Sequence, residues 1–228
     1  MNRTVNVVRM QLVNRQTFVW MPLIILGGSF ALSLLVYAMI PTDAPKYGGG
    51  AQAPLWYLLA VGIQALSLTF PFSQAMSITR REFYLGTLLT AAGAALTLTA
   101  LFIVGGYIEL ATNGWGMNGW FFYFPWIWEA GPLGAAFFYS VMAMLLFIVG
   151  FWSATIYRRF GGTILTIVLV GIGLLFVGLL WLVGQLDAWE QVGRWITTAG
   201  AVGLTAWAAV AAVVLAGIAY LTLRRAVP

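Results

Sequence analysis

Six long apolar stretches, separated by short polar segments, dominate the pattern of this chain. They run over residues 17–40, 54–76, 86–110, 133–152, 163–184 and 195–222. Each has about 20 residues or more, enough at about 1.5 Å per residue to cross a hydrocarbon core roughly 30 Å thick. The pattern predicts an all-α, polytopic membrane protein, with a cytoplasmic interfacial segment at residues 1–16 and a six-helix transmembrane domain at residues 17–228.

The basic residues predict the orientation of these helices. Threading the chain through six spans places nine of its 11 basic residues on one side: Arg3, Arg9, Arg15, Arg80, Arg81, Arg158, Arg159, Arg224 and Arg225. Only Lys46 and Arg194 fall on the other side. Because cytoplasmic loops carry the excess of Lys and Arg, we expect both termini in the cytoplasm and the protein in the cell (plasma) membrane.

Composition narrows the possible chemistry. Charged residues are 7% of the chain, against about 25% in soluble domains, and the net charge of +5 sits at helix ends that face lipid headgroups, so no nucleic-acid partner is expected. The chain has no histidine and no cysteine, which excludes the usual catalytic triads and His or Cys metal sites. It also has no phosphate-binding loop. We therefore expect no enzyme activity, no catalytic residue, no metal site and no cofactor in this chain.

A polar stripe runs along the second predicted helix. Its members recur at spacings of three and four, which places them on one helical face: Gln64, Ser67, Pro71, Gln74 and Ser77. The stripe predicts either packing against other helices or the lining of a translocation pathway, and the pattern leaves both open. Pro71 lacks a backbone N–H, so it is expected to kink the helix.

An acid and an aromatic cluster lie near the outer end of the third predicted helix. Glu109 is placed about one turn inside that end, where an ionisable residue is a functional candidate; snorkelling of its side chain to the outer interface is the favoured alternative. The aromatic residues that follow are Trp115, Trp120, Phe121, Phe122, Tyr123, Phe124, Trp126 and Trp128. They are typical of an interfacial belt, with a substrate-exit surface or an oligomer contact as alternatives.

The connection between the second and third predicted helices mixes charges with aromatic residues. It contains Ile78, Thr79, Arg80, Arg81, Glu82, Phe83 and Tyr84. A topology signal needs only the two arginines. The added acid and aromatic residues indicate a short docking helix with an aromatic anchor and a charged rim, as protein contacts often have.

At this point the chain resembles a known family. The stretch Ser77-Ile78-Thr79-Arg80-Arg81-Glu82-Phe83-Tyr84-Leu85-Gly86, and Glu109 followed by Thr112-Asn113-Gly114-Trp115-Gly116, are similar to permease subunits of type-2 ABC exporters, in particular small actinobacterial members. The resemblance extends over nearly the whole chain, although its first segment is only weakly amphipathic and its outer hairpin is short.

The resemblance implies a dimer of six-helix permeases with a separate cytoplasmic ATPase, which binds ATP and Mg. Residues 78–84 would then form the coupling helix that contacts the ATPase, residues 1–16 an interfacial helix, and residues 185–195 an outer hairpin. We expect export of a hydrophobic or amphipathic substrate, such as a drug, a peptide antibiotic or a lipid. The alternatives are a non-transporting accessory or sensor subunit, a secondary transporter and, least favoured, an intramembrane enzyme.

Overall fold

The computed structural model describes residues 3–224, so Arg225 of the orientation argument lies outside the described residues. Three long helices form the centre of the molecule: α5 (Arg80–Ala111), α7 (Gly131–Phe160) and a broken helix made of α3 (Ala53–Gln64), a π-helical turn (Ala65–Thr69) and α4 (Phe70–Ala75). Around them lie α1 (Arg3–Val13), α2 (Met21–Met39) with its preceding π-helical turn (Gln16–Trp20), α8 (Gly162–Gln185) and α9 (Trp189–Leu223). The short elements are β1 (Lys46–Tyr47), a 3-10 turn (Gly49–Gln52), the turn Gly114–Asn118, β2 (Gly119–Trp120) and α6 (Pro125–Trp128).

Within residues 3–224, six helical segments are long and apolar enough to cross a membrane, and each overlaps one predicted stretch. They are Gln16–Met39, Gly49–Ala75, Arg80–Ala111, Gly131–Phe160, Gly162–Gln185 and Trp189–Leu223. The predicted number and positions of the apolar helices are therefore confirmed, and the architecture is that of an all-α, multi-pass membrane protein.

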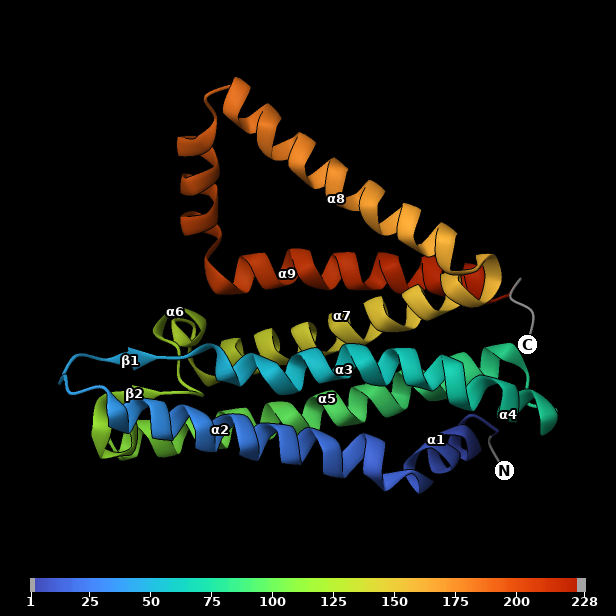
Figure 1. The fold of residues 1–228 in the computed structure, drawn as a ribbon, viewed down its shortest axis with the longest axis horizontal. Helices are drawn as coiled ribbons and strands as arrows, with labels where there is room; N and C mark the ends of the chain where they lie inside the picture. Colours follow the sequence, from blue (N-terminus) through green and yellow to red (C-terminus); the bar gives the residue numbers. More distant parts are fainter. Residues whose placement is uncertain (1–2, 225–228) are drawn as a thin grey trace.

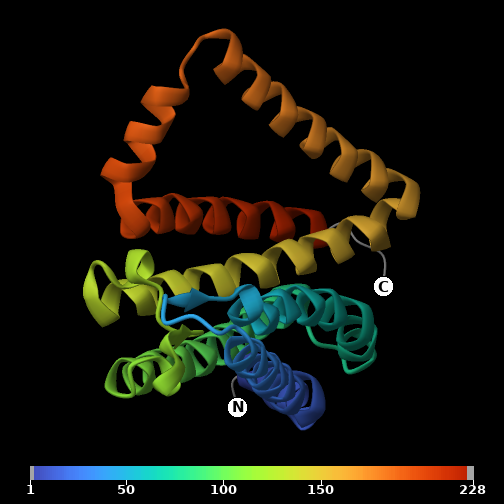
Figure 2. The ribbon, with the colours of Figure 1, turned by 60° about the vertical axis from the view of Figure 1, so that its left-hand side comes forward.

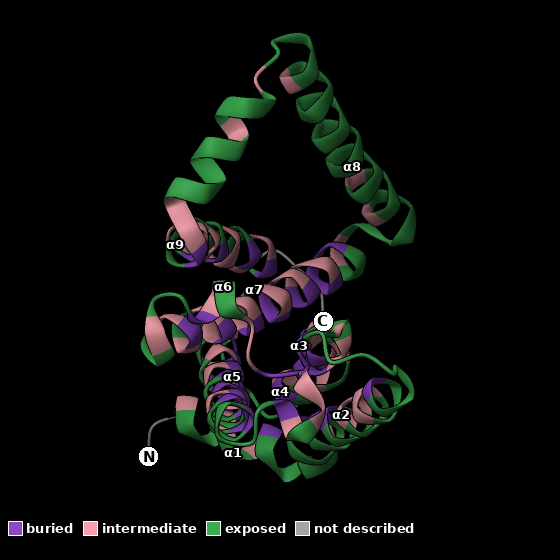
Figure 3. Cartoon of the chain, turned by 90° about the vertical axis from the view of Figure 1, so that its left-hand side faces the viewer, coloured by how far each residue is buried: buried purple, intermediate pink, exposed green. Residues whose placement is uncertain are grey.

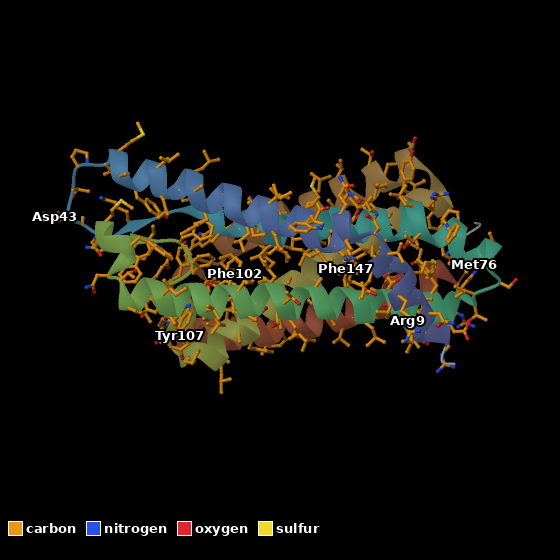
Figure 4. All side chains as sticks on the ribbon, turned by 90° about the horizontal axis from the view of Figure 1, so that it is seen from below. Arg9, Asp43, Met76, Phe102, Tyr107 and Phe147 are labelled. Carbon is orange, nitrogen blue, oxygen red and sulfur yellow. The ribbon has the colours of Figure 1, made fainter. Side chains whose placement is uncertain are left out.

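The two ends of the bundle differ in character (Figure 1). One end gathers the start of α1, the α4–α5 turn, the α7–α8 turn and the end of α9, and we call it the arginine end. The other holds the α2–α3 loop and the segment between α5 and α7, whereas the α8–α9 turn lies away from the bundle. Figure 4 places Arg9 and Met76 toward the first end and Asp43 at the second, with Phe102 and Phe147 between the helices.

The closest helix crossing joins α3 to α7 through two glycines. A Cβ atom added at Gly62 would lie 2.8 Å from the backbone nitrogen of Phe151, and one added at Gly150 would lie 2.8 Å from the backbone carbonyl carbon of Leu59. Neither backbone can give way, so both positions require glycine. Small residues permit this close approach in lipid, where burial of apolar surface gives little drive for helix association.

Helix α1 is docked on α5 rather than lying alone on a membrane surface. The fully buried side chain of Val7 packs on Gly86, where an added Cβ would lie 2.6 Å from the Cβ of Val7. The buried Gln11 donates from Nε2 to the hydroxyl of Thr87 over 2.7 Å. Arg9 is exposed on the other face of α1. The predicted interfacial segment is thus attached to the first turns of α5.

Helix α8 stands apart from the bundle (Figures 1 and 2). None of its residues is buried, and Figure 3 shows it exposed along its length. The chain then turns into α9, which bends sharply at Gly200, where φ is +60° and ψ −174°. This conformation is open to glycine and strained for other residues. The predicted outer hairpin region, residues 185–195, spans the last residue of α8, the α8–α9 turn and the first part of α9.

Candidate functional site

Glu109 is the organising residue at the end of the bundle opposite the arginine end. Its side chain is 0% exposed, and four N–H groups donate to its carboxylate. Oε1 accepts from the indole nitrogen of Trp115 and the backbone nitrogen of Phe121, and Oε2 accepts from the backbone nitrogens of Phe122 and Tyr123, all over 2.8 Å. Such bonds compensate for burial of a charged group. The expectation that Glu109 snorkels to the interface is wrong, because the loop folds over it instead.

A left-handed turn brings the loop back to Glu109. The φ angles of Asn113, Gly114, Trp115 and Gly116 are +48°, +65°, +61° and +72°. For residues with a Cβ atom this conformation costs roughly 1–2 kcal/mol each, so surrounding contacts must hold it. The indole bond of Trp115 to Glu109 is one such contact.

The α2–α3 loop ties this segment down, and together we call residues 40–52 and 112–128 the cap. Strand β1 pairs in parallel with β2. The hydroxyl of Tyr37 donates to the carbonyl of Trp120 over 3.1 Å, and the amide of Asn118 donates to the carbonyl of Asp43 over 2.8 Å. The ammonium of Lys46 donates to the carbonyl of Tyr37 over 3.1 Å. The cap is therefore held by hydrogen bonds from α2, from its own two segments and from α5.

The aromatic residues of the cap form its interior. Phe121 is fully buried, Phe122 and Trp128 are nearly so, and the ring of Phe30 in α2 lies 5.3 Å from that of Phe121 and 5.5 Å from that of Phe122. Trp126 is 45% exposed. The prediction of an interfacial belt is therefore wrong for the buried rings, because they cover the ends of α2, α5 and α7.

An apolar cavity of about 380 Å³ lies below the cap, between α3, α5 and α7. Its lining includes Leu55, Phe102, Phe124, Phe138, Met142 and Leu146. The hydroxyl of Tyr139, which also lines it, donates to the carbonyl of Phe122 over 2.8 Å. The volume lies within the range of about 300–1,000 Å³ for small-molecule sites, and the lining suits an apolar molecule.

At the arginine end, the α4–α5 turn is a helix cap rather than a separate docking helix. The hydroxyl of Thr79 accepts from the backbone N–H of Glu82 over 3.3 Å, and the carboxylate of Glu82 accepts from the backbone N–H of Thr79 over 3.0 Å. This capping box begins α5 at Arg80. The predicted coupling segment, residues 78–84, therefore consists of the end of a turn and the first helical turn of α5.

The two aromatic residues of that segment are buried inside the chain. Phe83 is 0% exposed, with its ring 5.2 Å from that of Phe70, and Tyr84 donates its hydroxyl to the carbonyl of Ala216 over 2.7 Å. The expectation of an exposed aromatic anchor is wrong, because the first turn of α5 packs between α4 and α9. Thr79 and Arg81 are the exposed residues of the segment; Ile78, Arg80 and Glu82 are partly buried.

The polar stripe follows the broken helix α3–α4. Gln64, Ser67, Pro71 and Gln74 are partly buried and Ser77 is exposed. Because Pro71 offers no N–H to the carbonyl of Ser67 one turn earlier, that carbonyl instead accepts from the guanidinium of Arg158 over 2.7 Å. Gln74 donates from Nε2 to the carbonyl of Ile78 over 3.1 Å. Parts of the stripe thus serve local hydrogen bonding, and its members line none of the cavities described here.

Sequence reasoning missed Tyr37, Gln11 and Thr87 as organising residues. Each is a polar group among apolar neighbours, which is the available signal, but their partners lie 76 or more residues away in the chain. Among residues 3–224, no group of three or more acidic side chains is placed to hold a metal ion. No protein-family model, curated protein or solved structure matches this chain.

Proposed function

We propose that this chain is the membrane-spanning permease subunit of an ATP-driven, type-2 ABC exporter in the plasma membrane. In this proposal both termini are cytoplasmic, two permease copies pair, and a separate ATPase binds ATP and Mg. The observation that carries the proposal is the continuity of α5, a 32-residue helix that starts at the capping box of Thr79 and Glu82 in the α4–α5 turn and reaches Glu109. About 29 residues at 1.5 Å each separate the two ends by roughly 44 Å.

Helix α5 is suited to transmit movement between a cytoplasmic partner and the cap. A partner that contacts Thr79 and Arg81 would displace the start of α5, and α1 would move with it through Val7 and Gln11. At the far end, Glu109 would carry that displacement to the cap. ATP binding shifts such an equilibrium only if the ATPase binds one position of α5 more tightly than the other.

The cavity below the cap supports a hydrophobic or amphipathic substrate. Four residues of the cap form part of its lining, namely Ala51, Gln52, Phe124 and Ile127, while the remaining lining comes from α3, α5 and α7. Displacement of the cap would therefore open the cavity on the side away from the ATPase. A drug-like molecule, a lipid or a peptide with an apolar side chain would fit this lining.

The test is purification of the tagged chain from its own cells in mild detergent, followed by measurement of ATP hydrolysis. We expect ATPase activity to co-purify with the wild-type chain and to fall at least tenfold with Arg81→Glu. Arg194→Glu is the matched control, because Arg194 is an exposed arginine at the other end of the bundle, and it should retain the activity. A folded wild-type chain that purifies without ATPase activity would refute the proposal.

Transport by reconstituted vesicles separates the remaining candidates. The exporter requires ATP to move an amphipathic dye. An accessory subunit would bring the ATPase but move no dye, and a secondary transporter would move dye with an ion gradient and no ATPase.

A further inference from the structure

An open surface cleft lies between α5 and α9 at the arginine end. It has a volume of about 510 Å³, and its apolar walls are formed by Leu85 and Leu88 of α5 and by Ala216 and Gly217 of α9. Leu85 is 42% exposed, and a Cβ atom added at Gly217 would meet nothing within 4 Å. The volume is that of a small-molecule site, and nothing in the described chain fills the space over Gly217.

Two tyrosines hold the cleft in shape. The hydroxyl of Tyr84 donates to the carbonyl of Ala216 over 2.7 Å, which joins α5 to α9 directly. The rings of Tyr84 and Tyr220 lie 5.1 Å apart, and Tyr84 also contacts Phe151 of α7 with a ring separation of 5.8 Å. Tyr84 is almost fully buried, so its bond to Ala216 holds α9 against the start of α5.

Positive charge gathers where the cleft meets the arginine end. Arg81 lines the cleft and is exposed. Arg224 lines a second hollow with Arg159, and its guanidinium lies 5.9 Å from the centre of the ring of Tyr220, which is a lining residue of the cleft. The guanidinium of Arg80 donates to the backbone carbonyl of Arg224. The acid on this turn of α5, Glu82, accepts hydrogen bonds from Thr79 at the helix cap. The mouth therefore combines guanidinium groups with an apolar interior.

We propose that this cleft binds an anionic phospholipid, with an acyl chain between α5 and α9 and the phosphate at Arg81 and Arg224. Guanidinium groups match phosphate oxygens in geometry and in charge, and they are the donors used most often for such groups. The apolar walls account for the acyl chain, and a soluble phosphate compound would leave them unused. The proposal is independent of the transported substrate, because the cleft lies at the opposite end of the bundle from the cavity below the cap.

The proposed contact between the arginines and the lipid phosphate is tested by titrating the purified chain with phosphatidylglycerol and phosphatidylcholine in native mass spectrometry. Near a membrane surface each arginine contributes about fivefold to anionic-lipid affinity, so Arg81→Gln/Arg224→Gln should weaken phosphatidylglycerol binding about 25-fold. Arg9→Gln/Arg15→Gln removes the same charge from exposed arginines outside the cleft and should leave this binding within about twofold. Equal weakening by the two double variants, or equal wild-type affinity for both lipids, would overturn the proposal.

The proposed position of the acyl chain between α5 and α9 is tested by filling the cleft with a side chain. Gly217→Leu places a side chain in the open space and should weaken phosphatidylglycerol binding at least tenfold. Gly171→Leu is the matched control, since Gly171 is also an interior helical glycine with nothing within 4 Å of an added Cβ. Unchanged binding by Gly217→Leu, or competition by glycerol phosphate as strong as that by the lipid, would overturn the acyl-chain assignment. The proposed function also places Arg81 in contact with the ATPase, so the deciding readout is lipid binding: unchanged phosphatidylglycerol binding in an Arg81→Gln/Arg224→Gln variant that loses the ATPase would assign Arg81 to the protein partner and refute the lipid site.

Discussion

Replacing Glu109 by glutamine tests whether one carboxylate holds the cap closed. The substitution preserves the size of the side chain and removes its charge. One carboxylate oxygen becomes an NH₂ group, so two of the four N–H donors around Glu109 lose their acceptor and face another donor. The cap is expected to open more often, with the helices that carry it unchanged.

The hydrogen bonds set the magnitude. A buried donor without an acceptor costs about 1–3 kcal/mol, so two such donors cost about 2–6 kcal/mol. Glutamine also removes the desolvation cost of a buried charge, which offsets part of this loss. We therefore expect closure of the cap to weaken by about 2–4 kcal/mol, the lower part of that range.

A single cysteine provides the assay, because the chain has none of its own. Ala51 is 3% exposed, lies in the cap and lines the cavity, and cysteine is a small apolar replacement for alanine. The Ala51→Cys protein is solubilised in detergent and labelled with a maleimide. If labelling requires opening, a loss of about 2 kcal/mol raises the labelling rate about 30-fold.

Glu129→Gln is the control, because Glu129 is an exposed acid close to the cap and its neutralisation should leave the labelling rate unchanged. A Glu109→Gln protein that labels no faster than its parent would refute the reasoning. Equal acceleration by both variants would do the same, since net charge rather than the four hydrogen bonds would then control the cap.

Two further predictions concern the helix bundle, each measured by thermal unfolding in detergent. Gly150→Ala should lower the stability of the protein by about 1–3 kcal/mol, because the added methyl group overpacks the α3–α7 crossing. Gly93→Ala is the control: it has open space around it and should leave stability unchanged or raise it. Equal effects of the two substitutions would contradict a close contact between α3 and α7 at Gly150. Arg158→Gln should cost about 1–3 kcal/mol by leaving the Ser67 carbonyl without its donor. Pro71→Ala supplies a backbone N–H that can bond to the carbonyl of Ser67, so Arg158→Gln should lower stability by less in a Pro71→Ala protein. If the stability changes of the two substitutions simply add, Arg158 does not replace the hydrogen bond that Pro71 cannot make.

Much of the fold could be predicted because each membrane-spanning helix is recognised from one continuous apolar stretch of the sequence. Every predicted apolar stretch overlaps a helix. The start of α5 was not predicted: residues 78–84 were expected to form a separate docking helix, although Thr79 and Glu82 match the capping pattern. The start of α1 was harder to interpret. Its apolar face is weak by itself, and only contact with Gly86 and Thr87 explains why Val7 and Gln11 are buried.

The candidate site was less predictable, because exposure depends on contacts between distant residues. Phe83 and Tyr84 are indistinguishable in sequence from aromatic anchors for a partner, yet Phe70 and Ala216 cover them. Glu109 is unusual already in the sequence, as an acid near the end of an apolar stretch. Three of its four partners, however, are backbone amides, and a sequence carries no record of where an amide N–H points.

The number of apolar helices, their approximate limits and the asymmetry of charge follow from the amino-acid order, because the length of an apolar stretch and the charges beside it depend on neighbouring residues. Tertiary structure alone decided that the outer aromatic residues form the interior of a cap, that Glu109 is saturated with donors and that Arg158 serves the carbonyl left by Pro71. Each of these depends on a hydrogen bond or a packing contact between segments separated in the chain, and such contacts exist only once the helices have assembled.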